Sequence, residues 1–336
     1  MMEMKLILNL LFAVILLSAC GQKDTQATHS AAISVTDAKG NAVQLNQPAQ
    51  RVVVLFEPLL DAVYMLQSED ALVGISSKLY LNEDTFHQLR LIDDRVNNKT
   101  LATPGDEESL NIESVVALNP DLVVGYNIPE SVVSSLQDMG IAVYIGRSET
   151  YADTEKEIQD LGKLLGKEKR SQELLDFAKE EFKKLQNNTK NITPKKAYFS
   201  WANGRIFTTV GTGSMMGQCL EFAGVKNVVA SKIDVPNINP ETLVSWNPDV
   251  IYMWNDSPEL FYKHPQLQAV QAVKNRQAYN LLPMFFYNPH TLKALLTTLR
   301  IQNWAYQLKT EEEVKQMEQS YLQKLYGKEK GEKFHF

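Results

Sequence analysis

Short apolar runs alternate with amphipathic stretches through most of the chain. The run at 51–56 is uninterrupted after Arg51, as expected of a strand that is covered on both faces. Comparable runs, each expected to form a strand, lie at 71–75, 121–125, 141–145, 197–201, 206–210, 249–253 and 278–282. Apolar residues at helical spacing predict helices at about 59–67, 111–118, 129–139, 215–222 and 241–246. This alternation predicts an α/β fold with mainly parallel sheets.

Two regions depart from that alternation. Residues 33–45 alternate apolar and polar positions around Lys39-Gly40-Asn41, which predicts a β-hairpin. At 153–190, charged residues surround apolar positions at helical spacing, so we expect one long helix, which Gly166 could interrupt. Two further helices are expected near the end of the chain, at 291–307 and 311–326.

One segment occurs twice. Residues 111–124 recur at 239–252, and Asn, Glu, Asn, Pro and Asp occupy the same five places in both copies. Turn chemistry alone would account for the repeated Asn-Pro-Asp, but not for the Asn and Glu that stand one helix earlier. We therefore expect two similar α/β lobes, at 33–152 and 191–336, joined by the helix at 153–190.

The first twenty residues predict export. Lys5 precedes an apolar stretch from Leu6 to Leu17, which is too short to span a bilayer and is followed by Ser18-Ala19-Cys20. This ending resembles the lipobox of bacterial lipoproteins, which implies cleavage before Cys20 and a lipid on its thiol. An ordinary signal peptide with a chance cysteine is the alternative. Residues 21–32 have little to bury and should form a flexible tether.

Composition and motifs narrow the function. A net charge of −6 argues against nucleic acid as a partner, because phosphate binding needs a basic surface. Cys219 lies in a helical pattern and is expected to be a buried, inert thiol. The chain has no familiar catalytic motif, and its histidines lack metal-ligand spacing, so we expect no enzyme, no resident cofactor and no metal site of the protein's own.

Aromatic side chains follow several of the predicted strands. Ligands of open α/β sheets bind in the crevice beyond the carboxyl ends of the strands, where loops of both lobes would meet. Aromatic residues with a few polar groups suit a large, partly apolar ligand. Each aromatic taken alone could equally well pack at a sheet edge. The candidate ligand-binding residues are Tyr126, Trp201, Arg205, Trp254, Tyr287 and His290.

Asn-x-Glu followed after six residues by Pro-Asp in both lobes, together with Glu221-Phe-Ala-Gly224 and Ala272-Val-Lys274, carries a family resemblance. From about residue 49 to 307 the chain resembles the substrate-binding proteins of ABC importers for cobalamin, ferric siderophores and haem. The resemblance implies a helical-backbone periplasmic binding protein. Such a protein is expected to be a monomer, held on a bacterial membrane by its lipid and facing the periplasm or the cell exterior.

The resemblance also implies roles for individual residues. Glu113 and Glu241 would dock into arginine pockets of the permease, which works with its ATPase; each could instead simply stabilise a helix N-terminus. A ferric siderophore is the preferred ligand, with haem or cobalamin next and molybdate, tungstate or a nickel chelate as alternatives. Arg205 would neutralise an anionic chelate, and Tyr287 or His290 would complete a metal's coordination.

Some features remain open. Asn288-Pro289-His290 departs from the small residue–Pro–Arg usual in the family, so the resemblance implies no role for that loop. An extracytoplasmic hydrolase and a structural surface lipoprotein are the hypotheses from other classes. Because a helix is a stiffer connection than a strand hinge, we also expect only modest closure of the lobes on binding.

Overall fold

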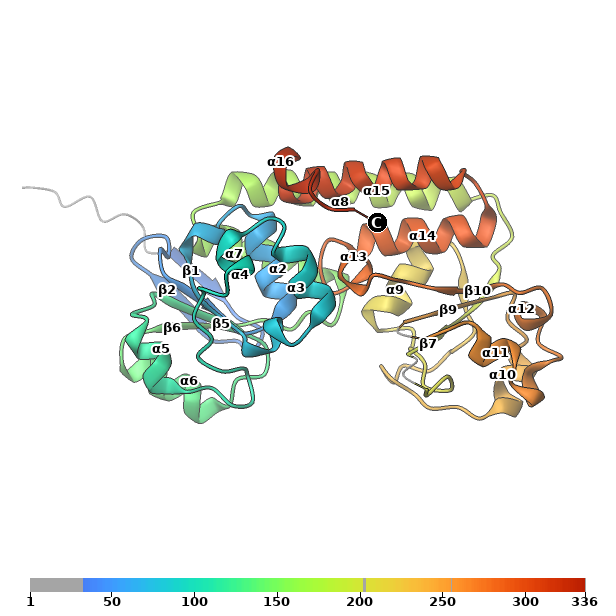
Figure 1. Ribbon diagram of the computed structural model, residues 1–336, viewed down its shortest axis with the longest axis horizontal. Coiled ribbons are helices and arrows are strands. Elements are labelled where there is room, and N and C mark those ends of the chain that lie inside the picture. Colours follow the sequence, from blue (N-terminus) through green and yellow to red (C-terminus); the bar gives the residue numbers. More distant parts are fainter. Residues whose placement is uncertain (1–32, 202–203, 255, 336) are drawn as a thin grey trace, which may run out of the picture. The chain divides into compact units, whose positions relative to one another are not determined.

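Two four-stranded parallel sheets organise the part of the chain that this computed structural model describes, residues 33–201, 204–254 and 256–335 (Figure 1). The expected signal at 1–20 with Cys20 and the tether at 21–32 lie outside the described residues. Both sheets fall within one compact unit. Within the described ranges, no helix combines the length and apolar character needed to cross a membrane.

The first sheet has the strand order β4-β3-β5-β6. Its strands are short and buried, and Val52 and Val54 face one hydrophobic cluster while Val53 faces another. An uninterrupted apolar run is therefore explained by a sheet with both faces covered. The strands are β3 (Val52–Val54), β4 (Leu72–Ile75), β5 (Leu122–Gly125) and β6 (Ala142–Ile145), and the predicted helices are α2 (Glu57–Met65), α5 (Ile112–Ala117) and α6 (Glu130–Asp138).

The predicted hairpin is confirmed as the antiparallel pair β1 (Ile33–Thr36) and β2 (Ala42–Leu45), beside the first sheet. Short helices that the apolar pattern did not predict lie on both sides of β4 in the chain. The helix η2 (Glu69–Ala71) precedes β4, and η3 (Ser77–Tyr80), α3 (Glu83–Leu89) and α4 (Asp94–Asn97) follow it. Asn82 and Asp93 begin the last two by accepting hydrogen bonds from the backbone of Thr85 and Arg95.

The second sheet has the order β10-β9-β7-β8. Its strands are β7 (Lys196–Ser200), β8 (Lys226–Asn227), β9 (Val250–Met253) and β10 (Ala278–Asn280). Helices α9 (Met215–Phe222), α10 (Pro240–Trp246), α11 (Glu259–Tyr262), η4 (Pro265–Leu267) and α12 (Gln271–Lys274) connect them. If the four strands of each sheet are numbered along the chain, both sheets have the spatial order 2-1-3-4. This shared order confirms two similar lobes.

The prediction of a strand at 206–210 was wrong. This segment forms turns and a single antiparallel bridge between Thr208 and Asn237. Its backbone groups form hydrogen bonds with loops instead; Thr209 N, for example, donates to the carbonyl of Pro236 at 2.9 Å. The apolar side chains Ile206 and Val210 are still buried. Burial alone made the run apolar, while a strand also requires a partner strand in register.

The repeated segments occupy equivalent positions. Asn111 begins α5 by accepting a 2.7 Å hydrogen bond from Ser114 N, and Asn239 begins α10 in the same way from Thr242 N at 2.8 Å. After each helix an asparagine adopts the left-handed conformation, with φ of 46° at Asn119 and 45° at Asn247. Asparagine tolerates this conformation better than most residues, which explains why the turn repeats it.

The repeated aspartates also play one structural part. Asp121 Oδ2 accepts from Arg51 N at 2.9 Å, and Asp249 Oδ2 accepts from Lys196 N at 2.8 Å. Each carboxylate thereby joins the start of its own strand to the start of the neighbouring one. The duplication therefore extends from sequence to hydrogen bonding.

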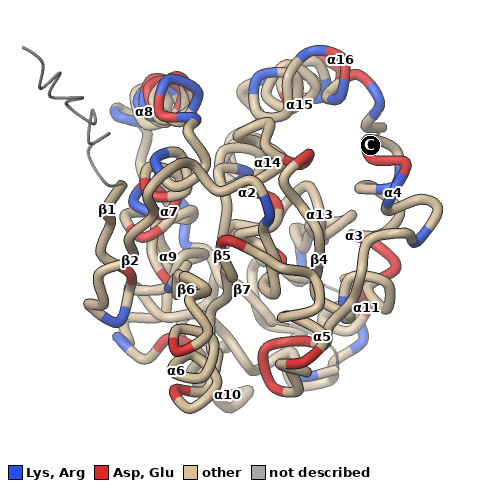
Figure 2. The backbone as a smooth tube through the Cα atoms, turned by 90° about the vertical axis from the view of Figure 1, so that its left-hand side faces the viewer, with Lys and Arg blue, Asp and Glu red and all other residues tan. Residues whose placement is uncertain are grey.

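The region predicted as one long helix is two helices, α7 (Tyr151–Leu164) and α8 (Glu168–Thr189). Gly166 lies between them with φ of 67°, and a Cβ there would approach Pro48 Cγ to 2.9 Å. The helix is therefore interrupted at a position whose backbone conformation favours glycine. Because α7 packs on α2 and β1, α8 alone makes the connection onward. Figure 2 shows acidic and basic residues interspersed along α8.

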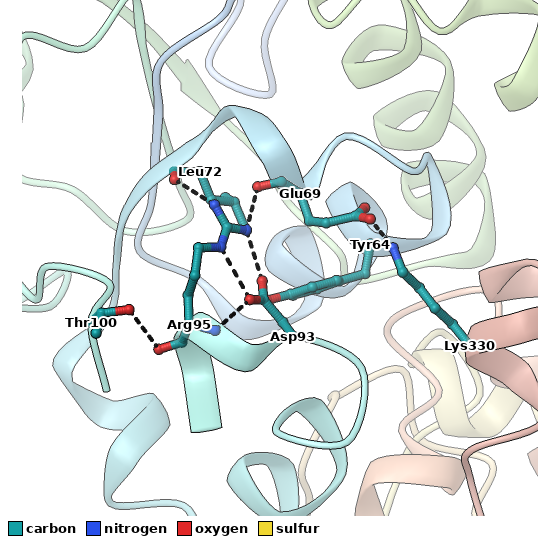
Figure 3. Close-up of polar contacts among 7 residues, drawn as sticks. All are labelled: Tyr64, Glu69, Leu72, Asp93, Arg95, Thr100 and Lys330. Atoms are coloured by element: carbon teal, nitrogen blue, oxygen red, sulfur yellow. Dashed lines mark hydrogen bonds and ion pairs between the residues drawn. The ribbon is translucent and has the colours of Figure 1, made fainter. Parts of the chain in front are cut away.

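The end of the chain returns to the first lobe. Helices α13 (Met284–Tyr287) and α14 (Ala294–Tyr306) precede α15 (Glu311–Tyr326) and α16 (Lys328–Gly331). Helix α15 contacts α8 through Tyr321, whose hydroxyl donates a 2.8 Å hydrogen bond to the carboxylate of Glu181 in α8. Lys330 of α16 forms an ion pair with Glu69, whose carbonyl also accepts from Arg95 at 2.7 Å (Figure 3). The second lobe is therefore tied to the first by more than the connecting helix.

A single hydrophobic cluster runs through both lobes. It contains Val54 of the first sheet and Phe199 of the second. Between them, the ring of Phe182 in α8 lies 4.8 Å from Tyr151 and 4.9 Å from Phe222, measured between centroids. The lobes thus share part of their core on the side of the helices.

Candidate functional site

Loops at the carboxyl ends of both sheets contact one another. The strand β10 of the second lobe leads into residues 281–290, where Phe285 N donates to Asp84 Oδ2 of α3 at 2.9 Å. Further along, His290 Nδ1 lies 2.5 Å from the carbonyl oxygen of Ser148, which follows β6. Parallel strands end at one edge of a sheet, so these contacts bring the two carboxyl edges together.

A cavity of about 630 Å³ lies between α3 and α13 at this place. Its volume falls in the range of ordinary small-molecule sites. Both lobes contribute to its walls. The residues that line it are Glu57, Asn82, Asp84, Thr85, Leu282, Pro283, Met284, Phe285 and Asn288.

Glu57 begins α2 directly after β3. Its carboxylate accepts from the Thr85 hydroxyl at 2.5 Å and from Asn82 Nδ2 at 3.0 Å. Burial raises the pKa of Glu57 above 4.5, against the opposing effect of these hydrogen bonds. Sequence reasoning did not select this residue, although its place immediately after a buried strand was a signal that could have found it.

Tyr126 follows β5 and is partly exposed. Its ring stacks on Phe56 with centroids 4.9 Å apart, and its hydroxyl donates to Glu149 Oε1 at 3.3 Å. The Glu107 carboxylate holds the loop by accepting from Tyr126 N. Burial and the Glu149 carboxylate raise the pKa of Tyr126. Tyr126 therefore offers a flat, neutral aromatic face with an acidic residue at its hydroxyl end.

His290 lies on the other side of the contact. Burial lowers its pKa below 6.5, although the Ser148 carbonyl and the charges of Asp234 and Glu149 act in the opposite direction. The imidazole is therefore neutral at pH 7, and donation from Nδ1 to the Ser148 carbonyl leaves the lone pair on Nε2. Such a nitrogen can accept a hydrogen bond or bind a metal.

Trp201 and Trp254 follow β7 and β9 and form an edge-to-face pair with centroids 5.0 Å apart. Trp254 is only 3% exposed and also packs edge-on against Phe199. Trp201 is partly exposed. Neither indole nitrogen has a hydrogen-bond acceptor within the described residues. The pair forms an aromatic wall at the carboxyl edge of the second sheet.

Two candidates lie elsewhere. Tyr287 is buried, and its hydroxyl donates to Glu318 of α15 at 2.9 Å, so it packs α13 against the last helices. Arg205 is exposed and lines a separate cavity of about 430 Å³, whose other walls, including Phe207, Asn237 and His264, also come from the second lobe. The structure thus brings Tyr126 and His290 into one neighbourhood and places Arg205 and Tyr287 in different surroundings.

Glu113 and Glu241 occupy the first turns of α5 and α10, two residues after the capping asparagines. Both side chains are exposed, and none of the described residues forms an ion pair with either. They present two carboxylates at equivalent points of the duplicated fold. Across the described ranges, no group of three or more His, Cys, Asp or Glu side chains has a geometry that could hold a metal ion.

Two duplicated parallel-sheet lobes with a cavity where their carboxyl edges meet define a bilobal binding protein. The sequence profile of the periplasmic binding protein family matches residues 52–284. This match covers more than half of the chain, and the protein belongs to that family.

Relatives and solved structures agree with this assignment. The uncharacterized ABC transporter substrate-binding lipoprotein YvrC of Bacillus subtilis is 25% identical over 290 residues, covering 82% of this chain and 88% of YvrC. The molybdate-binding protein MolA of Haemophilus influenzae is 26% identical over 266 residues, covering 73% and 74%. The structure of Helicobacter pylori CeuE with Ni-His superimposes with a TM-score of 0.72 at 21% identity, covering 91% of this chain and 99% of CeuE. That likeness concerns the fold.

Proposed function

We propose that this protein is the extracytoplasmic substrate-binding component of an ABC importer, which captures a metal chelate between its lobes and delivers it to the permease. The observation that carries the proposal is the cavity of about 630 Å³ whose walls come from both lobes, at the carboxyl edges of two duplicated sheets. YvrC, named as a substrate-binding lipoprotein of an ABC transporter, supports the transport role. The proposed lobes are 33–152 and 191–336, connected through 153–190.

A ferric siderophore is the ligand we favour, with haem or cobalamin next. None of the six candidate residues lines the cavity itself. Beside it, Tyr126 and Trp201, which packs on the buried Trp254, would supply aromatic surface for an organic shell, and His290 would supply a neutral nitrogen for the metal. A molybdate-binding protein and a structure with Ni-His stand among the similar proteins, so molybdate, tungstate and nickel chelates are the second candidate class. A bare oxyanion would leave the aromatic surface without a partner.

Delivery would use Glu113 and Glu241. Paired carboxylates at equivalent positions suit two arginine-containing pockets on a permease with two-fold symmetry, because arginine and carboxylate form charge-assisted, bidentate hydrogen bonds. We further propose that Cys20 carries the lipid that holds a monomeric receptor on a bacterial membrane.

The test is a binding panel on the purified mature chain, read by quenching of the fluorescence of its four tryptophans. The panel contains a ferric trihydroxamate, haem, cyanocobalamin, sodium molybdate and a nickel–histidine complex. We expect saturable one-to-one binding of an organic chelate, and weaker binding by the Trp201→Ala variant. Tight binding of molybdate without binding of any organic chelate would overturn the preferred ligand class. Absence of binding across the panel would favour a structural lipoprotein, and turnover of a bound compound would favour a hydrolase.

A further inference from the structure

We propose that the inter-lobe site selects a ligand with net positive charge. This inference rests on the proposed function and deepens it, because it names the charge class of the chelate. It departs from the expectation that Arg205 would neutralise an anionic one.

The cavity wall is acidic. Glu57 and Asp84 line the cavity, and none of its described lining residues is Lys or Arg. The side chains that donate hydrogen bonds to the Glu57 carboxylate, Thr85 and Asn82, are both neutral. The carboxylate charge at this wall is therefore not cancelled by a basic residue of the same wall.

Two more carboxylates act on the neighbouring loops. Glu149 belongs to the first lobe and accepts from the Tyr126 hydroxyl at 3.3 Å. Asp234 belongs to the second lobe, yet its charge acts on the ionisation of both Tyr126 and His290. An acidic residue from each lobe thus acts electrostatically on Tyr126 and on His290.

Four basic residues near these loops are directed elsewhere, while Lys232, two residues before Asp234, is exposed. Lys293, whose charge reaches Glu57, is paired at 2.9 Å with the buried Asp61. Arg147 follows β6 but donates to the Ala38 carbonyl at 3.3 Å. Lys78 Nζ lies 3.7 Å from a carboxylate oxygen of Glu108 and 4.0 Å from one of Asp106. Both acidic residues belong to the loop before α5, which is red in Figure 2. Arg205 lines the separate cavity of the second lobe.

Uncancelled carboxylates in a walled crevice concentrate the electrostatic field there and favour a ligand of opposite sign. Aromatic faces add to this preference, because the negative face of an aromatic ring attracts cations. A chelate with oxygen donors around the metal and a peripheral ammonium group fits both features. An oxyanion or a carboxylate-rich chelate would meet repulsion at Glu57, Asp84, Glu149 and Asp234.

The experiment compares chelates that differ mainly in charge. One series is a ferric trihydroxamate with a free terminal ammonium, the same chelate N-acetylated, and the same chelate N-succinylated. The other is an iron porphyrin with N-methylpyridinium groups and one with sulfonates. Dissociation constants are measured on the full mature chain by fluorescence quenching and calorimetry, at low and high salt. In whichever series binds, we expect the cationic member to bind about tenfold or more tightly than the anionic one, and the preference to shrink with salt.

Charge-neutralising variants provide the second readout. Glu149→Gln and Asp234→Asn should each reduce the cation-to-anion preference, and the double variant should reduce it further. Glu180→Gln removes the same charge from an exposed position on α8 and should leave the preference unchanged.

The outcomes separate the two proposals. Equal or tighter binding of the anionic member, or a preference that the double variant does not alter, would overturn the charge inference while leaving the importer role intact. If no member of either series binds, the charge inference fails, and the importer role is then decided separately by the panel with cyanocobalamin, molybdate and the nickel–histidine complex.

Discussion

Lys293, at the start of α14, forms a 2.9 Å ion pair with Asp61 of α2, and both side chains are at most 4% exposed. The pair joins the two lobes directly. Tyr326 of α15 also donates to Asp61, and Lys293 Nζ lies 3.5 Å from the ring centroid of Phe285. Two other segments, the start of α14 and α15, therefore converge on the buried carboxylate of α2.

Removing one member of this pair should strongly destabilise the protein. Lys293→Met leaves Asp61 buried without its counter-charge, so we expect a loss of about 3–5 kcal/mol in the free energy of unfolding. The double variant Asp61→Leu/Lys293→Met removes both charges and should recover much of this loss. Urea unfolding followed by circular dichroism measures both effects. A cost below about 1 kcal/mol for Lys293→Met, typical of surface pairs, would show that the pair is not a structural link.

Charge reversal at the two repeated glutamates should abolish uptake without disturbing ligand capture. We expect the double variant Glu113→Arg/Glu241→Arg to bind ligand as the wild type does, and to change stability by no more than about 1 kcal/mol, because both residues are exposed at helix N-termini. Whole-cell uptake of the bound ligand, or receptor-stimulated ATPase activity of the reconstituted transporter, measures docking. Glu130→Arg is the matched control, since it carries the same reversal in the first turn of α6. An equal defect in the control would argue against specific docking sites.

His290 should make the stability of the protein pH-dependent. Burial lowers its pKa from an ordinary value of 6.5, so in this range the unfolded chain binds the proton more readily than the folded one. The contribution of this residue to stability is therefore complete above the unfolded value and is lost as pH falls from 6.5 toward the lower folded value. Between pH 8 and pH 5, the wild type should lose more stability in urea unfolding than His290→Gln. The exposed His87 offers a comparison, because His87→Gln should retain the wild-type pH dependence.

The lobes should move little when ligand binds. They share a hydrophobic cluster, they are linked by α8, and α15 adds the Tyr321–Glu181 contact. With Cys20 replaced by Ser, spin labels at Gln137→Cys and Gln266→Cys would report one exposed position in each lobe. We expect the distance between the labels to change by no more than about 2 Å on binding. A swing of many ångströms would mean that α8 acts as a hinge, contrary to this expectation.

Local sequence patterns predicted most of the secondary structure because the signals are themselves local. Asn111 and Asn239 cap helices through side chains that reach only three residues along the chain. Buried strands such as β5 required uninterrupted apolar runs, and the Asn-Pro-Asp repeat marked equivalent turns. The failure at 206–210 has the opposite cause, since a strand also needs a partner that lies elsewhere in the chain.

The sequence likewise predicted the position of some residues of the candidate site and not of others. The order of residues along the chain was enough to place Tyr126, Trp201 and Trp254 after buried strands, because parallel strands share one carboxyl edge. It was not enough to separate Tyr287, buried against Glu318, from His290 three residues later. Which way a side chain points in a loop depends on the elements packed around it, and those elements come from distant parts of the chain. For the same reason, the effect of the Asp234 charge of the second lobe on the pKa of Tyr126 in the first was decided by the tertiary structure alone.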